Sequence, residues 1–510
     1  MRGALLVAGT HSDAGKSVVA AGICRWLRRE GVRVAPFKAQ NMALNSVVTP
    51  DGAEIGRAQA VQAAAAGIEA EAAMNPILIK PSGQRHSQVI VMGRAYADAD
   101  ARSYQELKHE LRPVVAGALA DLRERFDVVV CEGAGSPAEI NLRDADLTNM
   151  WLAREAGLPV IVVADIDRGG VFASLFGTLA LLDAEDQAQV AGFVINKFRG
   201  DDSILAPGLA QLEERSGRPT LGVLPWLEDA WLDVEDSLAL EGRRAEAPAL
   251  GDTLDVAVIR LRWMSNFTDA DALAAEPGVR VRFTRSPADV ERADLVVVPG
   301  TKATVEDLER LRADGLDRAL AARAASGRPL LGICGGYQLL GERIEDAVES
   351  GRGAVEGLGL LPVTTHFERD KLLRRRGGRS PLFGADAGGY EIRHGRVERH
   401  GGEPLLQSDD GEPDGCAAGG VYGTSWHGLL EHDAFRRALL TRVAAARGRH
   451  FVPGTSAFAD TREARLDKLG DLIADHMDTQ RLGALIDNGA PADLPTIDTE
   501  VRRVALRDHG

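Results

Sequence analysis

A glycine-rich loop near the N-terminus restricts the possible folds of this chain more than any other segment. The loop, Gly9–Ser17 (GTHSDAGKS), follows the apolar run Ala4–Ala8 and precedes the helix-compatible run Ser17–Glu30. A strand, a glycine-rich turn, a Lys-Ser pair and a helix in this order predict a P-loop, in which backbone N–H groups and the helix N-terminus bind phosphate oxygens. The sequence therefore predicts an α/β fold with a parallel sheet behind this loop.

The residue types in the loop predict a site for ATP and Mg²⁺. Lys16 is expected to neutralise the β- and γ-phosphates, and Ser17 to bind Mg²⁺ through its hydroxyl. Glu132 ends an apolar run and is followed by glycines, so we expect it to complete the metal site, the alternative being an ordinary acid at a strand end. The other loop residues expected to contact the nucleotide are Gly9, Thr10, Asp13, Ala14 and Gly15.

Short runs rich in Val and Ile alternate with helix-compatible segments in the first half of the chain. Runs of this kind are typical of a parallel sheet that is covered on both faces by crossover helices. Further strands are expected at Val32–Phe37, Asp127–Cys131, Pro159–Ala164 and Val190–Ile195. The polar stretch 242–252 contains Gly and Pro and has no periodicity, which predicts a linker after a first domain over residues 1–241.

A second α/β series follows the predicted linker and defines a second domain over residues 253–445. Its strands are expected at Asp255–Ile259, Val279–Phe283, Asp294–Val298, Pro329–Ile333 and Gly420–Trp426. The basic run Arg374–Arg376 is interpreted as part of a solvated loop.

Residues 446–510 are expected to form a helical segment and a tail. Thr461–Met477 has apolar residues at helical spacing, which favours a helix that packs on the rest of the chain or forms a contact in a homo-oligomer. The tail past Gly489 carries Pro and mixed charge and is expected to be loosely ordered.

Charge and cysteine content argue against several classes of protein. A formal net charge of −15 disfavours non-specific nucleic-acid binding, because the polyanion would be repelled. The four cysteines are too few for a disulfide framework and too far apart for a zinc ribbon, which fits a cytoplasmic protein. No apolar run reaches the length of a membrane span, and the first one is too short for a signal peptide.

A second motif, around Cys334, predicts a nucleophile. An apolar run, PLLGI, leads directly into Cys334 and two glycines, and then into a helix. A nucleophile at a tight strand-to-helix turn requires small neighbours because the backbone there is strained. The N–H of Gly335 would face a developing oxyanion, and a second donor is expected from Gly300 and Thr301. A buried structural cysteine is the alternative for Cys334, and it is the preferred interpretation of Cys24, Cys131 and Cys416.

The general base for Cys334 is expected to be a distant histidine. His427, in the segment YGTSWHG, follows a strand-like run and precedes a glycine. Its position at a strand end, after the cysteine in chain order, distinguishes it from the other histidines of the chain.

The two motifs resemble two known enzyme families. GICGGYQLLG with the later WHG is similar to class I glutamine amidotransferases, which implies a flavodoxin-like α/β fold. GTHSDAGKS with CEGAG is similar to P-loop ligases of the dethiobiotin synthetase type, whose loop is one residue longer than the standard P-loop, as it is here. Many class I amidotransferases carry a glutamate two residues after the histidine, but this chain has Leu429 there and Glu431 further on. We therefore expect a backbone carbonyl or water to orient the His427 ring.

Nearly the whole chain resembles the cobyric acid synthase family. The segments that carry the resemblance are PFKAQNMALNS (36–46), EIGRAQAVQA (54–63), MNPILIKPSG (74–83), SQVIVMGR (87–94), CEGAGSPAEINLRDADLTNM (131–150), DIDRGGVFAS (165–174), INKFRGD (195–201), SNFTDADAL (265–273) and GYEIRHG (389–395). The resemblance implies that glutamine is hydrolysed at Cys334 and that ammonia passes to the ATP site. There, the b, d, e and g carboxylates of adenosylcobyrinic acid a,c-diamide would be activated as acyl phosphates and become amides.

The same resemblance implies further binding residues. Asn196 and Lys197 would lie near the adenine, together with Gly222–Pro225. Four polar residues, placed on loops that follow strands, would lie near the corrin carboxylates or the phosphate: Gln40, Asn41, Asn45 and Asp146. Loop capping is the alternative for each of these four. A weak or gated glutaminase is expected when the corrinoid and ATP are absent.

Three other functions stay open from the sequence. One is a ligase with the same two modules and another carboxylate substrate, such as cobyrinic acid a,c-diamide synthase or a cell-wall amidase. Another is a P-loop ATPase of the partitioning kind, which has no use for a cysteine elbow and a distal histidine. The third is a binding module with an inactive glutaminase domain, against which the intact Cys334 and His427 argue.

Overall fold

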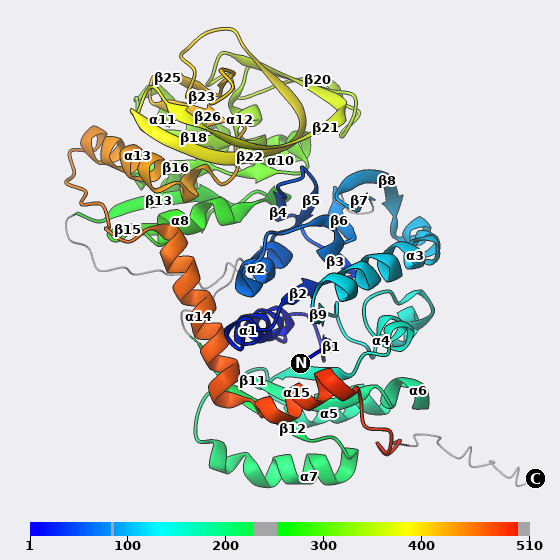
Figure 1. Ribbon diagram of the computed structural model, residues 1–510. Helices are drawn as coiled ribbons and strands as arrows, with labels where there is room; N and C mark the ends of the chain where they lie inside the picture. Colours follow the sequence, from blue (N-terminus) through cyan, green and yellow to red (C-terminus); the bar gives the residue numbers. More distant parts are fainter. Residues whose placement is uncertain (83–85, 228–251, 498–510) are drawn as a thin grey trace, which may run out of the picture.

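The computed structural model describes residues 1–82, 86–227 and 252–497 (Figure 1). The predicted linker, apart from Asp252, and the last part of the tail lie outside these ranges. Two six-stranded sheets, one from each half of the chain, form the cores of the two main bodies in Figure 1, and a third six-stranded sheet in the second half contains a long hairpin. The predicted α/β fold is confirmed.

The first sheet is entirely parallel, with the strand order β12-β11-β10-β1-β9-β2. All of its strands except the edge strand β12 are largely buried because helices cover both faces, which explains the Val- and Ile-rich sequences of several of them. In chain order the strands are β1 (Gly3–Gly9), β2 (Val34–Phe37), β9 (Val128–Glu132), β10 (Val160–Asp165), β11 (Val190–Phe198) and β12 (Thr220–Pro225).

The helices of this half connect and cover the sheet. They are α1 (Lys16–Arg29), α2 (Arg57–Ala66), α3 (Ala101–Arg125), α4 (Met150–Ala156), α5 (Val171–Ala180), α6 (Ala184–Gln187) and α7 (Ala206–Ser216), with short 3₁₀ turns at Ala72–Met74, Ile140–Ala145 and Asp202–Ile204. A smaller sheet with the order β3-β6-β7-β8 lies beside them. Its strands and the nearby β4–β5 pair are β3 (Gln40–Met42), β4 (Ser46–Val48), β5 (Glu54–Gly56), β6 (Ile77–Pro81), β7 (His86–Val91) and β8 (Arg94–Asp100).

The second main sheet has the order β15-β13-β16-β18-β26-β25 and is parallel except for its edge strand β25. Its strands are β13 (Leu254–Ile259), β15 (Val279–Thr284), β16 (Leu295–Val298), β18 (Leu330–Ile333), β25 (Cys416–Ala418) and β26 (Val421–Thr424). The helices around it are α8 (Asp271–Ala274), α9 (Pro287–Arg292), α10 (Thr304–Ala313), α11 (Leu316–Ala325), α12 (Gly335–Leu340) and α13 (Asp433–Ala446), with 3₁₀ turns at Phe267–Ala270 and Leu429–Glu431.

A long hairpin, β21–β22, projects from this half, and short strands flank it. The strands concerned are β14 (Met264–Ser265), β17 (Gly300–Thr301), β19 (Arg343–Asp346), β20 (Gly353–Glu356), β21 (Val363–Ser380), β22 (Ala385–Arg399), β23 (Leu406–Ser408) and β24 (Pro413–Asp414). The prediction of a loop at Arg374–Arg376 was wrong, since these residues belong to β21, whereas the predicted exposure to solvent is found for Arg374 and Arg375. The Arg376 side chain is only 11% exposed because it pairs with Glu391 at 2.7 Å and with two further carboxylates.

The C-terminal segment returns to the first half of the chain. Helix α14 (Phe458–His476) runs from the second half to α1 in Figure 1, and α15 (Thr479–Asn488) follows it. The predicted apolar face of α14, including Leu466, Leu469 and Ile473, shares one buried cluster with Ile23 and Leu27 of α1. The predicted helix therefore packs on the chain itself.

The tail is ordered further than the sequence predicted. The Arg218 guanidinium donates to the carbonyl of Pro495, and the N–H of Ile497 donates to the side chain of Gln187 at 2.7 Å. These contacts hold residues 489–497 against α6 and the turn before β12, so the expectation of a loosely ordered tail was wrong over this stretch. In the described ranges, no helix is long and apolar enough to cross a membrane.

Candidate active sites

The predicted P-loop forms the turn between β1 and α1. Gly15 has a φ of 101°, and a Cβ atom there would lie 1.9 Å from Nδ2 of Asn196, so the turn requires glycine. Lys16 folds back over Gly9, and its Nζ donates to two backbone carbonyls at 2.9 and 3.1 Å. The N–H of Thr10 is bonded to β10 at 3.0 Å. The loop thus combines the Lys16 ammonium group with a tightly turned backbone at the N-terminus of a helix. This is the arrangement that binds phosphate.

The two residues predicted as metal ligands, Ser17 and Glu132, are in contact. The Ser17 hydroxyl donates to Oε1 of Glu132 at 2.8 Å, and Lys38 and Gln62 donate to the same carboxylate at 2.9 and 2.5 Å. Burial raises the pKa of Glu132, but Lys38, Gln62 and Ser17 lower it by more, so this carboxylate is charged at neutral pH. Hydroxyl and carboxylate oxygens are ligands of the kind that Mg²⁺ takes.

A buried acceptor without a hydrogen-bond partner in the described ranges lies at the same edge. This atom is Oδ1 of Asn149, and a Cβ atom on Gly133, directly after Glu132, would lie 2.1 Å from it. No group of three or more His, Cys, Asp or Glu side chains suited to a metal exists within the described residues. A metal here would therefore take most of its ligands from phosphate and water, as Mg²⁺ does in nucleotide sites.

The side chains of Asn196 and Lys197 bond backbone carbonyls of the phosphate loop. Asn196 donates to the carbonyl of Ala14 at 3.0 Å, while Lys197 donates to the carbonyl of Asp13 at 2.9 Å and to Asp165 at 2.7 Å. The Asp13 side chain itself is mostly exposed. These contacts fix the backbone of the loop, and proximity to an adenine stays a prediction.

The four residues implied for the corrin carboxylates or the phosphate each bond other groups of the protein. Gln40 and Asn41 lie in β3, so their placement on a loop was wrong, and each bonds a neighbouring side chain, at 2.6 and 2.9 Å. The Asp146 carboxylate accepts three backbone N–H bonds at the start of α4. This contact is the loop capping that was the alternative to a binding role. Asn45 reaches the second half of the chain, where its Oδ1 accepts the N–H of Phe267 at 3.2 Å.

Cys334 occupies a strained turn between β18 and α12, as the sequence predicted. Its φ is 49°, which is unfavourable for a residue with a Cβ atom, and its N–H is held by the carbonyl of Thr424 at 2.8 Å. A Cβ atom on Gly336 would lie 1.9 Å from the carbonyl oxygen of Val298, so a larger residue would not fit behind the elbow. The cysteine is buried, with Sγ 3.8 Å from the carbonyl of Ile392.

The expected oxyanion residues lie against this elbow. A Cβ atom on Gly335 would be 2.7 Å from the backbone nitrogen of Thr301, and one on Gly300 would be 2.7 Å from Cε1 of His427. The Thr301 hydroxyl donates to buried Asp307 at 2.5 Å, which anchors this turn. The structure therefore brings Gly300, Thr301 and Gly335 together beside Cys334 and His427.

His427 interacts with Cys334 and is oriented by Asp269. Its Nδ1 lies 2.7 Å from Oδ2 of Asp269, whose other oxygen accepts the N–H of Gly428 at 2.7 Å. Burial lowers the pKa of His427, but the charges and hydrogen bonds of Asp269 and Cys334 raise it by more, to about 10. The expectation that a backbone carbonyl or water orients this ring was wrong, because a carboxylate does so. A protonated imidazole is the partner that a thiolate nucleophile requires.

Asp269 was missed in the sequence because it gives no local signal. It lies in the 3₁₀ turn Phe267–Ala270, 158 residues before the histidine, whereas the usual position of the third residue is just after it. Its segment, SNFTDADAL, contains a second aspartate, Asp271, as well as Asn266, so the sequence alone does not single out Asp269. One clue was available: Asp269 follows strand β13 by a short loop on the sheet that carries the elbow, and carboxyl ends of parallel strands meet at one edge.

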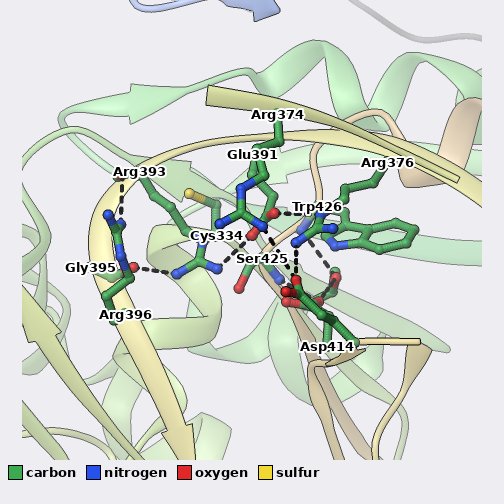
Figure 2. Close-up of polar contacts among 12 residues, drawn as sticks. Cys334, Arg374, Arg376, Glu391, Arg393, Gly395, Arg396, Asp414, Ser425 and Trp426 are labelled. Carbon is green, nitrogen blue, oxygen red and sulfur yellow. Dashed lines mark hydrogen bonds and ion pairs between the residues drawn. The ribbon is translucent and has the colours of Figure 1, made fainter. Parts of the chain in front are cut away.

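A small cavity of about 40 Å³ opens in front of Cys334, and charged residues line it. Lys302 and Glu349, which pair with each other, lie on its wall together with Gln338 of α12. Arg393 is held on this wall by Glu391, at 2.9 Å, and by the carbonyl of Gly395, at 2.5 Å, as part of the network around Cys334 in Figure 2. The first half of the chain contributes one residue, Lys80 of β6. A larger cleft of about 660 Å³ is lined by Tyr390 and Glu431, among other residues of the described ranges, but not by Cys334.

Comparisons with known proteins match both halves of the chain to known families. Residues 5–238 match the family described as CobQ/CobB/MinD/ParA nucleotide binding domain, and residues 255–435 match the CobB/CobQ-like glutamine amidotransferase domain. The chain is 60% identical to cobyric acid synthase of Frankia casuarinae, with 98% of this chain and 99% of that one covered. Identity to the cobyric acid synthases of Streptomyces avermitilis and Streptomyces coelicolor is 59% for each, over 98% of this chain and 99% of theirs. With a nucleotide-binding half, a glutaminase-type half and full-length relatives at this identity, the chain belongs to the cobyric acid synthase family.

Proposed function

We propose that this chain works as a cobyric acid synthase, which uses ATP and glutamine to amidate adenosylcobyrinic acid a,c-diamide at its b, d, e and g carboxylates. The observation that carries the proposal is the Asp269–His427 pair beside Cys334, in a chain that also holds a complete phosphate loop. A nucleotide-dependent switch protein needs only the second of these sites, and a free glutaminase only the first.

The glutaminase half would release ammonia by thioester chemistry. Cys334 attacks the side-chain carbonyl of glutamine, and the oxyanion that forms is stabilised by backbone N–H groups at Gly335 and Thr301. Protonated His427, held by Asp269, gives its proton to the leaving nitrogen, so that ammonia departs and a thioester remains. Water, deprotonated by His427, then hydrolyses the thioester to glutamate and regenerates the thiol.

The charged wall of the small cavity suits a free amino acid. Glutamine carries an α-carboxylate and an α-ammonium group, and the cavity offers the cations Lys302 and Arg393 together with the carboxylate of Glu349. Arg393 is already oriented by Glu391, so binding a carboxylate would cost it little side-chain freedom. We place the α-carboxylate at Arg393 or Lys302 and the α-ammonium group at Glu349.

The nucleotide-binding half would activate each corrinoid carboxylate. Lys16 and the loop backbone hold the phosphates of ATP while a substrate carboxylate attacks the γ-phosphorus, which yields ADP and an acyl phosphate. Ser17 and Glu132 would hold Mg²⁺, which when bound supplies charge neutralisation at the phosphate oxygens. Ammonia from the first reaction attacks the acyl carbon, and phosphate leaves with formation of the amide.

Mass spectrometry of the corrinoid product tests the proposal. Incubation with the a,c-diamide, MgATP and glutamine is expected to convert each of the four carboxylates to an amide, with glutamate and ADP formed in proportion. Unamidated cobyrinic acid serves as the competing substrate. Preferred amidation of its a and c positions would instead identify a cobyrinic acid a,c-diamide synthase, and ATP hydrolysis without any amide would refute a ligase.

A further inference from the structure

We infer that Asn266 is a positioning residue through which the nucleotide-binding half of the chain holds the Asp269–His427 pair of the glutaminase in place. The inference rests on the proposed function, because it assumes that His427 serves glutamine hydrolysis at Cys334. It adds a physical connection between the two halves, made by a side chain that touches neither glutamine nor ATP.

Asn266 binds the backbone of the first half in the way that one β-strand binds another. Its Oδ1 accepts the N–H of Ser46 at 3.0 Å, and its Nδ2 donates to the carbonyl of Ser46 at 3.0 Å. Both residues are buried, with exposures of 2% and 0%, so neither bond competes with bulk water. The adjacent bond from the N–H of Phe267 to Asn45 fixes the same segment from the other side, at 3.2 Å.

The same asparagine contacts the catalytic pair on its other side by two routes. Its carbonyl accepts the N–H of Asp269 at 3.0 Å, which sets the 3₁₀ turn that presents the Asp269 carboxylate to His427. Its Nδ2 also donates to the hydroxyl of Tyr390 at 3.2 Å. Tyr390 stacks on the ring of His427, with ring centroids 5.8 Å apart, and the two residues exchange backbone hydrogen bonds of 2.8 and 2.9 Å.

The backbone of Asn266 is left-handed, with a φ of 49°. A residue with a side chain adopts this conformation at a cost in free energy, although asparagine tolerates it better than most. The position therefore favours glycine on conformational grounds alone. Because asparagine stands there instead, its side-chain bonds to Ser46 and Tyr390 offset that cost.

Tyr390 also contacts helix α2, which bonds Glu132 beside the phosphate loop. Arg57, the first residue of α2, donates to the Tyr390 hydroxyl at 3.5 Å and pairs with Glu431, near His427 in sequence. Five residues along the same helix, Gln62 donates to Glu132 beside the phosphate loop. Helix α2 therefore contacts both sites, through its first residue and through a residue near its middle, so a shift of the nucleotide-binding half is expected to move Tyr390 as well as residues 45–46.

The variant Asn266→Gly isolates the positioning role, since glycine fits the left-handed backbone and removes only the side-chain bonds. Its glutamine-dependent amidation rate in the full-length protein is expected to fall by about ten- to a hundredfold, because small displacements of a catalytic group have effects of this size. The fall should appear in kcat with little change in KM for glutamine. Amidation driven by added ammonium chloride should stay at the parent rate.

Two further variants complete the experiment. Asn266→Asp keeps the shape and the acceptor for Ser46 but loses both donor bonds, so it should also lower the glutamine-dependent rate and shift its pH profile. Met92→Gly is the matched control, because Met92 has a similar φ of 46° in the turn between β7 and β8 and a side chain exposed to solvent. It should leave both rates unchanged.

The outcomes separate this inference from the proposed function. If Asn266→Gly and Asn266→Asp keep glutamine-dependent rates within twofold of the parent while Cys334→Ser is inactive with glutamine, the inference is wrong and the function stands. A loss of ammonia-driven activity equal to the loss with glutamine would also overturn it, since the side chain would then support the fold as a whole. If Cys334→Ser hydrolyses glutamine at the parent rate, the proposed function itself fails.

Discussion

The phosphate loop and the cysteine elbow are built in different ways. The loop is one continuous segment, Gly9–Ser17, completed by Glu132 on the neighbouring strand β9. The cysteine site takes Cys334, His427 and Asp269 from three separate segments of the second half, and it is backed by residues of the first half through Asn266. A contiguous site can form wherever its strand and helix form, whereas a dispersed site depends on the packing of the whole molecule.

This difference predicts which activities each substitution should affect. A change at the phosphate loop should stop amidation from any nitrogen source, because the loop activates the carboxylate. A change at the cysteine site should spare amidation from free ammonia. Variants at Cys334 and Lys16 test this separation. Variants at Asp269 and Glu431 test which carboxylate belongs to the dispersed site.

Cys334→Ser is expected to have the largest effect. Loss of the nucleophile should lower glutamine-dependent amidation by about a hundred-thousandfold or more, as for other covalent catalysts. Ammonia-dependent amidation should continue at close to the parent rate in the same preparation. Cys416→Ser is the control: its sulfur already faces the carbonyl of Gly401 at 3.5 Å, so a hydroxyl finds an acceptor there. Loss of both activities in Cys334→Ser would break the separation of the sites.

Asp269→Asn should follow, with a loss of roughly a thousand- to ten-thousandfold in glutamine hydrolysis. The amide cannot stabilise an imidazolium and favours the wrong tautomer of His427. Glu431→Gln is the comparison, because Glu431 is the acid nearest to His427 in sequence but pairs with Arg57 and Arg462 instead. Glutaminase assays of the two variants should show the larger loss at Asp269; the reverse order would mean that the orienting carboxylate is misassigned.

Lys16→Ala should lower amidation by about a hundred- to a thousandfold, the usual effect of removing one preorganised charge-stabilising group. The loss should be the same with glutamine and with ammonia, measured as ADP and amide formed. Lys468→Ala, on the exposed side of α14, provides the control. A variant of Lys16 that fails with glutamine alone would contradict the assignment of carboxylate activation to the loop.

The smallest effect concerns stability against pH. The pKa of His427 is about 10 in the folded protein and about 6.5 in an unfolded chain, so its contribution to stability is complete below pH 6.5 and disappears as pH rises toward 10. Asp269→Asn removes the main partner that raises this pKa. The melting temperature of the parent should therefore exceed that of Asp269→Asn by several degrees near pH 6 and approach it near pH 10. A constant difference across this range would show that the pair is not ionic.

The sequence was most informative where a site is contiguous. Strands β1, β9, β10 and β18 were predicted from their short apolar runs, and the P-loop and the Cys334 turn followed from small residues at their ends. These features depend on local backbone geometry, which a few neighbouring residues determine. The fold class was predictable for the same reason, and the roles of the site residues stay predictions that the variants test.

The contacts made by tertiary packing could not be predicted in this way. The role of Asp269 depends on a 3₁₀ turn whose carboxylate contacts His427. The two residues are 158 positions apart, and no sequence pattern indicates that they are in contact. Arg376 looked solvated because its run of arginines gives no sign of Glu391, 15 residues later on the paired strand. The helical period of α14 predicted a buried face but not that α1 would cover it.

The path of α14 has a consequence for how the protein is made. The ribosome delivers the first sheet early, yet Leu466, Leu469, Leu472 and Ile473, which complete the core beside α1, are translated only after the whole second half. The first half therefore emerges with an uncovered apolar face, and it reaches its final packing only after α14 has been synthesised. Premature termination anywhere before α14 would leave the phosphate loop on an incomplete core.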